Sequence, residues 1–342
     1  MNPLLEVKDL EVAFSADKKE ITRIDKVSFL VSPGEILCIV GESGSGKSVT
    51  ALSVMGLLGK NGKITGGAIT FGGENLPAKS EKEMDKIRGS ELTMIFQDAL
   101  TSLNPVFTVG TQLTEIMVIH LKINKKEARV RAMGLLQKVG LPDPAAVMKK
   151  YPHTLSGGMR QRVMIAMALA CNPKLLIADE PTTALDVTIQ AQIMELLRKL
   201  NQEFNMSIIL ITHDMGLVAE MADRVLVMYA GQIVEEAEVG SLFKAPGHPY
   251  TRALLQSVPS IRDDDSRELI SIKGTVPEQY QEIRGCRFAN RCLYVHPDCS
   301  MEQKLTGTED GHLKRCWRTE IFHDSVSAGE EQGKQEESAG GK

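Results

Sequence analysis

The octapeptide GESGSGKS at residues 41–48 restricts the possible folds of this chain more than any other feature. It follows the apolar run ILCIV (36–40) and precedes a helical pattern, and a loop of this composition in that context is a P-loop that binds nucleotide phosphates. Gly41, Gly44 and Gly46 allow the backbone to curl so that its N–H groups face phosphate oxygens. The start of the following helix adds about half a unit of positive charge. We therefore expect a nucleotide at this loop.

Other residues of the same stretch complete the predicted site. Lys47 supplies a full positive charge to the phosphates, and the Ser48 hydroxyl is expected to bind the Mg²⁺ that bridges the terminal phosphates of ATP. Three more residues are expected to contact the nucleotide from this loop: Ser43, Ser45 and Val49.

Short apolar runs rich in isoleucine and leucine indicate strands that are buried on both faces of a parallel sheet. They lie at residues 36–40, 92–96, 174–178 and 207–212. A long helical pattern connects the last two runs, which favours an α/β architecture. Three early segments alternate apolar and polar residues and predict an antiparallel flank beside a mixed central sheet: 5–14, 26–35 and 66–76.

The chain divides into regions of different composition. Residues 1–240 are expected to form the nucleotide-binding domain, and a helical subdomain is expected to be inserted at about residues 100–170, where strand patterns vanish. Beyond "VMYAGQIVEEAEV" the pattern becomes irregular, so residues 241–322 are predicted to form an irregular extension that carries four cysteines. Residues 323–342 cannot bury enough apolar surface to fold and are predicted to be disordered.

Composition excludes several classes of protein. A net charge of −4 argues against a broad nucleic-acid surface, so no nucleic-acid partner is expected. The chain starts without a signal-peptide pattern and contains no stretch near the ~18 apolar residues of a membrane helix, which predicts a cytosolic chain. Six cysteines are too few for a disulfide-stapled secreted fold, and Cys38 and Cys171 lie in apolar runs where buried thiols are expected.

Two carboxylates follow the predicted strand at 174–178, at the sheet edge where ligands bind in such folds. Asp179 is expected to hold Mg²⁺ through water. Glu180 is then free to orient or deprotonate the attacking water, a role worth about 10²- to 10⁴-fold in rate. A helix cap is the alternative role for such a carboxylate, and Asp186 is an equal candidate for that cap.

His213 and Gln97 follow two further predicted strands in the same way. We expect His213 to hydrogen-bond the γ-phosphate, although a lone histidine in this position is more often structural. Gln97 is expected to contact Mg²⁺ or the attacking water. Glu180, His213 and Gln97 are therefore the predicted catalytic residues.

A second glycine pair follows Ser156 in the stretch LSGGMRQR, in front of a helical run. Ser156, Gly157 and Gly158 offer a helix N-terminus with unhindered backbone donors, which suits an anion. A γ-phosphate that is already surrounded by Lys47, Mg²⁺ and His213 has little room for another cradle from the same subunit. We predict that this turn binds the ATP of a partner subunit in a head-to-tail pair. A serine cap with a packing glycine is the alternative.

This ordered set of motifs resembles the nucleotide-binding subunit of an ATP-binding-cassette (ABC) transporter. The resemblance implies a P-loop ABC nucleotide-binding domain. It aligns Phe14 with the aromatic residue that stacks on adenine, a contact of about 1–3 kcal/mol by analogy with base stacking; core packing is the alternative role for Phe14. Asp186 aligns with the loop that signals across the dimer, and Gln97 begins the segment that faces the membrane subunits.

Longer stretches resemble the ATP-binding subunits of dipeptide and oligopeptide importers, a group that includes nickel transporters: 97–113, 180–197 and 247–259. The resemblance spans about residues 4–318. It implies an ATPase at the cytoplasmic face of a bacterial membrane that drives peptide uptake. The implied partners are a second, non-identical ATPase subunit, two transmembrane permease subunits and an extracytoplasmic peptide-binding protein. Nickel import, and a soluble ABC ATPase outside transport, remain alternatives.

Four cysteines crowd into the C-terminal region with the spacing C-x₅-C-x₆-C-x₁₆-C: Cys286, Cys292, Cys299 and Cys316. Structural zinc usually uses a C-x₂₋₄-C pair, and none occurs here. Four soft thiolates can instead hold a [4Fe–4S] cluster, which the resemblance implies for some members. Zinc, with His296 and His312 as further donors, and free thiols remain alternatives. A third alternative for the chain is that this cysteine region makes it chiefly a redox-regulated adaptor, with ATP turnover secondary.

Overall fold

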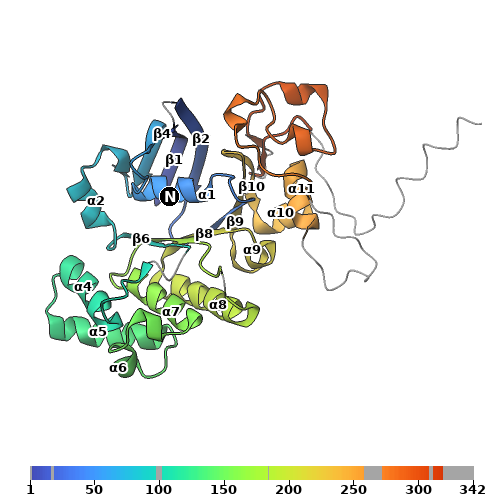
Figure 1. Cartoon of the computed structure of the whole chain (residues 1–342). Helices are drawn as coiled ribbons and strands as arrows, with labels where there is room; N and C mark the ends of the chain where they lie inside the picture. The colour runs from blue at the N-terminus through green and yellow to red at the C-terminus, as the bar shows by residue number, and fades with distance from the viewer. Residues whose placement is uncertain are drawn as a thin grey trace, which may run out of the picture.

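The computed structural model describes residues 2–16, 19–97, 102–183, 185–257, 272–307 and 311–318. The predicted tail at 323–342 lies outside these ranges. A mixed eight-stranded sheet runs through the centre, with an antiparallel sheet on one side and a group of helices on the other (Figure 1).

The central sheet has the strand order β11-β12-β10-β9-β3-β8-β7-β6. The strands from β9 to β6 are parallel, and β10, β11 and β12 pair antiparallel, so the predicted mixed sheet is confirmed. The bounds are β3 Ile36–Val40, β6 Leu92–Ile95, β7 Leu175–Asp179, β8 Ser207–Thr212, β9 Arg224–Tyr229, β10 Gln232–Glu238, β11 Thr306–Gly307 and β12 Leu313–Lys314.

The central strands are apolar throughout because both of their faces are covered. In β3, Leu37 and Ile39 pack into the core beneath the antiparallel sheet, whereas Cys38 and Val40 pack into the core beneath the helices. Cys38 and Cys171 are both buried, as the sequence predicts. Side chains alternate between the faces of a strand, so a strand buried on both sides requires an unbroken apolar run.

The antiparallel sheet has the order β2-β1-β4-β5. It consists of β1 (Leu5–Ala16), β2 (Lys19–Val31), β4 (Gly62–Phe71) and β5 (Glu74–Asn75). Helix α1 (Lys47–Met55) follows the P-loop and contributes Ala51 and Val54 to the core that this sheet shares with the central sheet. A short 3₁₀ turn, η1 (Leu76–Ala78), and α2 (Glu81–Ile87) lead into β6.

The other face of the central sheet carries the helices. They are α4 (Val109–Leu121), α5 (Lys125–Lys138), α6 (Pro144–Val147), the 3₁₀ turn η2 (Pro152–Thr154), α7 (Gly157–Ala168), α8 (Val187–Phe204) and α9 (Met215–Met221). Polar side chains cap their starts: Thr108, Asn124, Asp143, Ser156, Asp186 and Asp214 each accept a hydrogen bond from a backbone N–H of the first turn. Figure 1 shows α4 to α7 grouped at the end of the molecule farthest from the C-terminal extension.

The C-terminal region is more regular than the sequence predicts. Two helices follow β10, namely α10 (Val239–Lys244) and α11 (Pro249–Gln256), so the expectation of irregular structure beyond residue 240 was wrong for these residues. The 3₁₀ turns η3 (Tyr280–Glu282), η4 (Ala289–Arg291) and η5 (Pro297–Ser300) come next. The extension then adds β12 to the central sheet beside β10. No helix within the described ranges is long and apolar enough to span a membrane.

Candidate active site

The P-loop links β3 to α1 and depends on glycine for its shape. Gly41 has φ +148°, and a Cβ there would overlap the backbone oxygen of Met228. Gly46 has φ +107°, and a Cβ there would lie 2.7 Å from Ile24 Cδ1. The space beside Gly44 is open. A Cβ is therefore excluded at Gly41 and strained at Gly46, and the loop presents its backbone at the start of α1.

Lys47 lies within the loop and is only 5% exposed. Its Nζ donates to the carbonyl oxygens of Gly41 at 2.7 Å and Glu42 at 3.0 Å. Burial lowers the pKa of Lys47, and the negative charges of Glu180, Asp179 and Glu42 oppose that shift. The ammonium group is therefore held at the base of the loop, where it can neutralise a phosphate.

Ser48 and Asp179 meet from different elements. Ser48 Oγ, on α1, donates to Asp179 Oδ1 at 3.1 Å, at the end of β7. Burial is the main cause that raises the pKa of Asp179; the Ser48 hydrogen bond lowers it and the charge of Glu180 raises it. Mg²⁺ prefers oxygen ligands and is usually bound by one or two carboxylates together with substrate phosphates. These two side chains therefore fit the predicted magnesium site.

Three loops converge on Glu180. Gln97 Nε2 donates to Glu180 Oε2 at 3.0 Å, and Thr183 Oγ1 donates to the same oxygen at 3.1 Å. His213 Nδ1 lies 3.4 Å from Glu180 Oε1. Glu180 has φ +46°, which is unusual for a residue with a Cβ and occurs where the surroundings fix the backbone. The structure thus brings the three predicted catalytic residues together.

A pocket of about 600 Å³ lies in front of these groups. This volume is in the usual range of small-molecule sites. Phe14 on β1 lines the pocket together with loop residues and with Tyr280 from the extension. The lining residues are Phe14, Arg23, Ser43, Gly44, Gly46, Lys47, Ser48, Val49, Gln97, Glu180 and Tyr280. Ser45 is buried behind the loop, and its carbonyl accepts a hydrogen bond from Gly231 N–H.

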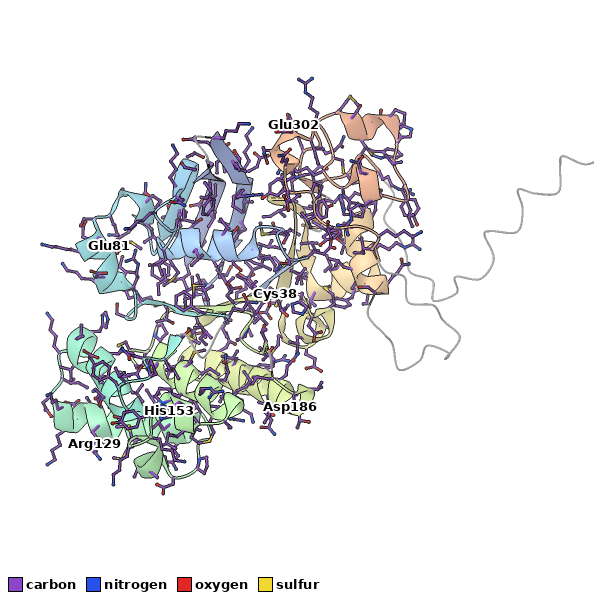
Figure 2. The ribbon with its side chains drawn as sticks, in the orientation of Figure 1. Cys38, Glu81, Arg129, His153, Asp186 and Glu302 are labelled. Atoms are coloured by element: carbon purple, nitrogen blue, oxygen red, sulfur yellow. The ribbon has the colours of Figure 1, made fainter. Side chains whose placement is uncertain are left out.

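The second glycine pair lies apart from this pocket. Ser156 Oγ accepts from Met159 N–H at 3.3 Å and caps α7, while Gly157 and Gly158 begin the helix and face side chains at the start of α8. Asp186 caps α8 through a 2.9 Å bond from Ile189 N–H. Figure 2 shows Asp186 at the start of that helix, far from the extension that carries Glu302. Within one chain, Ser156, Gly157, Gly158 and Asp186 do not line the nucleotide pocket.

The four C-terminal cysteines line one small pocket, together with His248 and aromatic side chains. Each sulfur accepts a backbone N–H: Cys286 from Phe288, Cys292 from Tyr294, Cys299 from His296 and Cys316 from Arg318. Burial raises the pKa of Cys286 to about 11 and also raises the pKa of Cys292 and Cys316. In the metal-free chain these three are therefore thiols near pH 7, and ligand binding must release protons.

The predicted C-terminal metal ligands are not grouped as a metal site in this structure. Across the described residues, no three histidine, cysteine or carboxylate side chains are grouped so that they could hold a metal ion. His296 stacks on Trp317 and His312 bonds to Glu235, and neither lines the cysteine pocket. A zinc site with histidine ligands therefore does not fit.

Comparison with known proteins identifies the family. The family model "ABC transporter" matches residues 24–183, and the model "Oligopeptide/dipeptide transporter, C-terminal region" matches residues 234–299. The chain is 54% identical to the Oligopeptide transport ATP-binding protein AppD of Bacillus subtilis over 319 residues, which cover 93% of this chain and 97% of that protein. The chain belongs to the ABC transporter family.

Two further similarities agree with this assignment. The Dipeptide transport ATP-binding protein DppD of Escherichia coli is 51% identical over 314 residues, which cover 92% of this chain and 96% of that protein. A solved dimeric structure of the ATP-binding cassette MJ0796, bound to ADP and Pi, is similar in fold with a TM-score of 0.62. It is 29% identical and covers 69% of this chain and 98% of that chain. The chain therefore has the predicted ABC cassette fold, and it is an ATP-hydrolysing ABC ATPase.

Sequence reasoning missed several residues of this ABC site. Tyr280 and Arg23 line the nucleotide pocket, and Tyr280 Oη donates to the Arg23 carbonyl at 2.9 Å. Arg291 of the extension pairs with Glu42 inside the P-loop. These contacts join residues more than 240 positions apart, and no motif in either segment signals them.

Proposed function

We propose that this ABC ATPase hydrolyses ATP to drive the uptake of oligopeptides or dipeptides. The observation that carries the proposal is the high identity to AppD and DppD over nearly the whole chain, including the C-terminal region. Both proteins are named for peptide transport, which favours peptides over nickel as the cargo.

Glu180 is the proposed general base. Gln97 and Thr183 both donate to its Oε2, so this oxygen is fixed, while Oε1 faces His213. A carboxylate held in this way can orient a water molecule and accept its proton. Lys47 neutralises phosphate charge, and Ser48 with Asp179 would hold Mg²⁺, which supplies further charge neutralisation at the phosphates.

We further propose that two subunits complete each ATP site. Ser156 and the N-terminus of α7 lie outside the pocket of their own chain, although their backbone donors suit a phosphate. In a head-to-tail pair they would face the nucleotide held by the partner's P-loop, and Asp186 would lie at the same interface. The proposed partner is a second, non-identical ATPase subunit.

A mostly apolar groove is the proposed docking site for a permease subunit. It lies between the ends of α1 and β6 on one side and α4 and α7 on the other, and it is lined by Met55, Leu57, Phe96, Ile116, Met164 and Met167 among others. Phe96 is exposed and directly precedes Gln97. Exposed apolar grooves with methionine side chains suit binding of another protein. A shift of the docked permease subunit at Phe96 would therefore move Gln97, which donates to Glu180.

The complete transporter would contain two transmembrane permease subunits and an extracytoplasmic peptide-binding protein. This chain would then bind peripherally at the cytoplasmic face of the membrane.

We also propose that the four-cysteine pocket holds a [4Fe–4S] cluster. The support is the set of four sulfurs around one pocket, each accepting a backbone N–H. The cluster would tie together an extension that has few core residues of its own. Iron and sulfide in near-equal amounts in anaerobically purified protein are expected; zinc, or neither iron nor sulfide, would exclude this assignment.

Transport by the reconstituted complex tests the main proposal. The chain is co-purified with its membrane partners, inserted into liposomes and supplied with ATP and Mg²⁺. We expect ATP-dependent accumulation of labelled dipeptides or oligopeptides. Accumulation of nickel without peptide, or an active ATPase with which no membrane protein co-purifies, would reject the proposal and favour one of the two alternatives.

A further inference from the structure

Glu42 of the P-loop is held from both sides by the C-terminal extension. Its backbone N–H donates to Tyr250 Oη at 2.8 Å, and Tyr250 is fully buried on α11. Its carboxylate accepts two hydrogen bonds from Arg291: from Nη1 at 2.7 Å and from Nη2 at 2.9 Å. The Glu42 carbonyl also accepts from Lys47 Nζ, so the residue that contacts the extension also contacts the phosphate-binding lysine.

Arg291 is rigidly placed for this contact. Its side chain is 7% exposed, and all its donor groups are used. Nε donates to the Lys273 carbonyl, Nη1 also donates to Tyr229 Oη, and Nη2 also donates to the Gly274 carbonyl. The guanidinium lies over the rings of Tyr229 and Phe288. A bidentate arginine–carboxylate pair in such a fixed setting defines geometry as well as charge.

We propose that Arg291 is a positioning residue for the P-loop, so that the C-terminal extension completes the ATP-binding site. Arg291 neutralises Glu42 and fixes the loop in the conformation that presents Lys47 and the backbone N–H groups to phosphate. Without Arg291, the Glu42 carboxylate would be left unpaired in the loop, and its negative charge, which already acts on Lys47, would oppose phosphate binding. The inference rests on ATP binding and hydrolysis, not on the identity of the cargo.

A double-mutant cycle of Arg291 and Glu42 in the full chain tests this role. Arg291→Gln should weaken ATP binding by about tenfold or more, since hydrogen bonds between charged groups are the strong ones. The double variant with Arg291→Gln and Glu42→Gln should bind ATP within about twofold of the Glu42→Gln single variant, because it has no unpaired carboxylate at position 42. Affinity is measured with a fluorescent nucleotide. An unchanged ATP affinity in Arg291→Gln would overturn the proposal. So would a double variant whose loss of affinity equals the sum of the losses in the two single variants.

Arg315 provides the matched control. Like Arg291 it directly precedes a pocket cysteine and hydrogen-bonds to the cassette, but it donates to the Ile233 carbonyl on β10, whereas Arg291 donates to the Glu42 carboxylate of the P-loop. Arg315→Gln should leave ATP affinity unchanged, and thermal unfolding of both variants checks that they fold. Equal weakening by both arginine variants would show a general effect of the extension and reject the specific role of Arg291.

Kinetics in the assembled transporter give a second readout. Arg291→Gln should raise KM for ATP while kcat at saturating ATP falls less than threefold, and Arg291→Lys should recover part of the affinity. A fall in kcat with no change in KM would refute positioning of the P-loop. A wild-type transporter that takes up no peptide, while Arg291→Gln still raises KM for ATP, would instead contradict the proposed cargo and leave this inference intact.

Discussion

Glu180 owes its proposed role to the side chains that hold it. Glu180→Gln keeps the shape and the contacts to Gln97 and Thr183 but removes the basic oxygen. We expect turnover to fall at least about 10²-fold while ATP affinity changes little, because the carboxylate acts on water and not on the phosphates. ATPase assays and nucleotide binding measure the two effects. Glu91→Gln, which removes an exposed partner of Lys174, serves as the control and should leave turnover unchanged.

His248 offers a separate test of the cysteine pocket. Its Nδ1 accepts from Tyr250 N–H at 3.1 Å, so the ring proton lies on Nε2, which is buried and has no hydrogen-bond partner among the described residues. His248 lines the four-cysteine pocket. A buried donor without an acceptor costs about 1–3 kcal/mol, which a sulfur of a bound cluster would offset.

Two substitutions separate the roles of the two His248 nitrogens. The Asn side chain in His248→Asn places an acceptor near the position of Nδ1 but is too short to place a donor at the position of Nε2. The longer Gln side chain in His248→Gln places an N–H donor near the position of Nε2. Hydrogen bonds to cluster sulfur stabilise the reduced state, so we expect His248→Asn to lower the reduction potential and His248→Gln to leave it near the wild-type value. Redox titration followed by electron paramagnetic resonance measures this. Three equal potentials would contradict a bond from Nε2.

The N-terminus of α7 is the part of this helix that we propose binds the partner's ATP. Ser156→Arg should leave ATP binding by the single chain intact, because Ser156 does not line its pocket, and should abolish hydrolysis in the assembly. The change also removes a cap worth about 1 kcal/mol. Asn124→Arg removes the equivalent cap of α5 and is the control for that loss, with hydrolysis expected to persist. Weaker ATP binding by the single Ser156→Arg chain would refute the assignment to the partner's nucleotide.

The elements differ in how well the sequence predicts them. Strands β3, β6, β7 and β8 coincide with the four apolar runs, because burial on both faces leaves no polar alternation to confuse the pattern. Helices α10 and α11 were missed because they are short and depend on tertiary packing, as the fully buried Tyr250 shows. The contacts around Glu180 follow from strand ends that meet at one sheet edge, which the sequence order already indicates.

At the scale of the whole molecule, sequence order could not reveal which distant segments share a site. The carboxylate of Glu42 and the guanidinium of Arg291 are 249 positions apart, and their pairing depends on how the extension folds back over the P-loop. Figure 1 shows that extension beside β2 and β10, at the opposite end from α4 to α7. The start of α7, which we expect to face a partner subunit, therefore lies at one end of the molecule. The Arg291–Glu42 contact, which the sequence did not predict, lies at the other end.

The pairing of β12 with β10 makes the extension part of the ATPase sheet itself. A chain cut after α10 would leave the β10 backbone at Glu235 and Glu236 without its β12 partner, and an open edge of this kind recruits strands from other molecules. Fragments that stop at the cassette boundary are thus expected to aggregate for a reason unrelated to nucleotide chemistry.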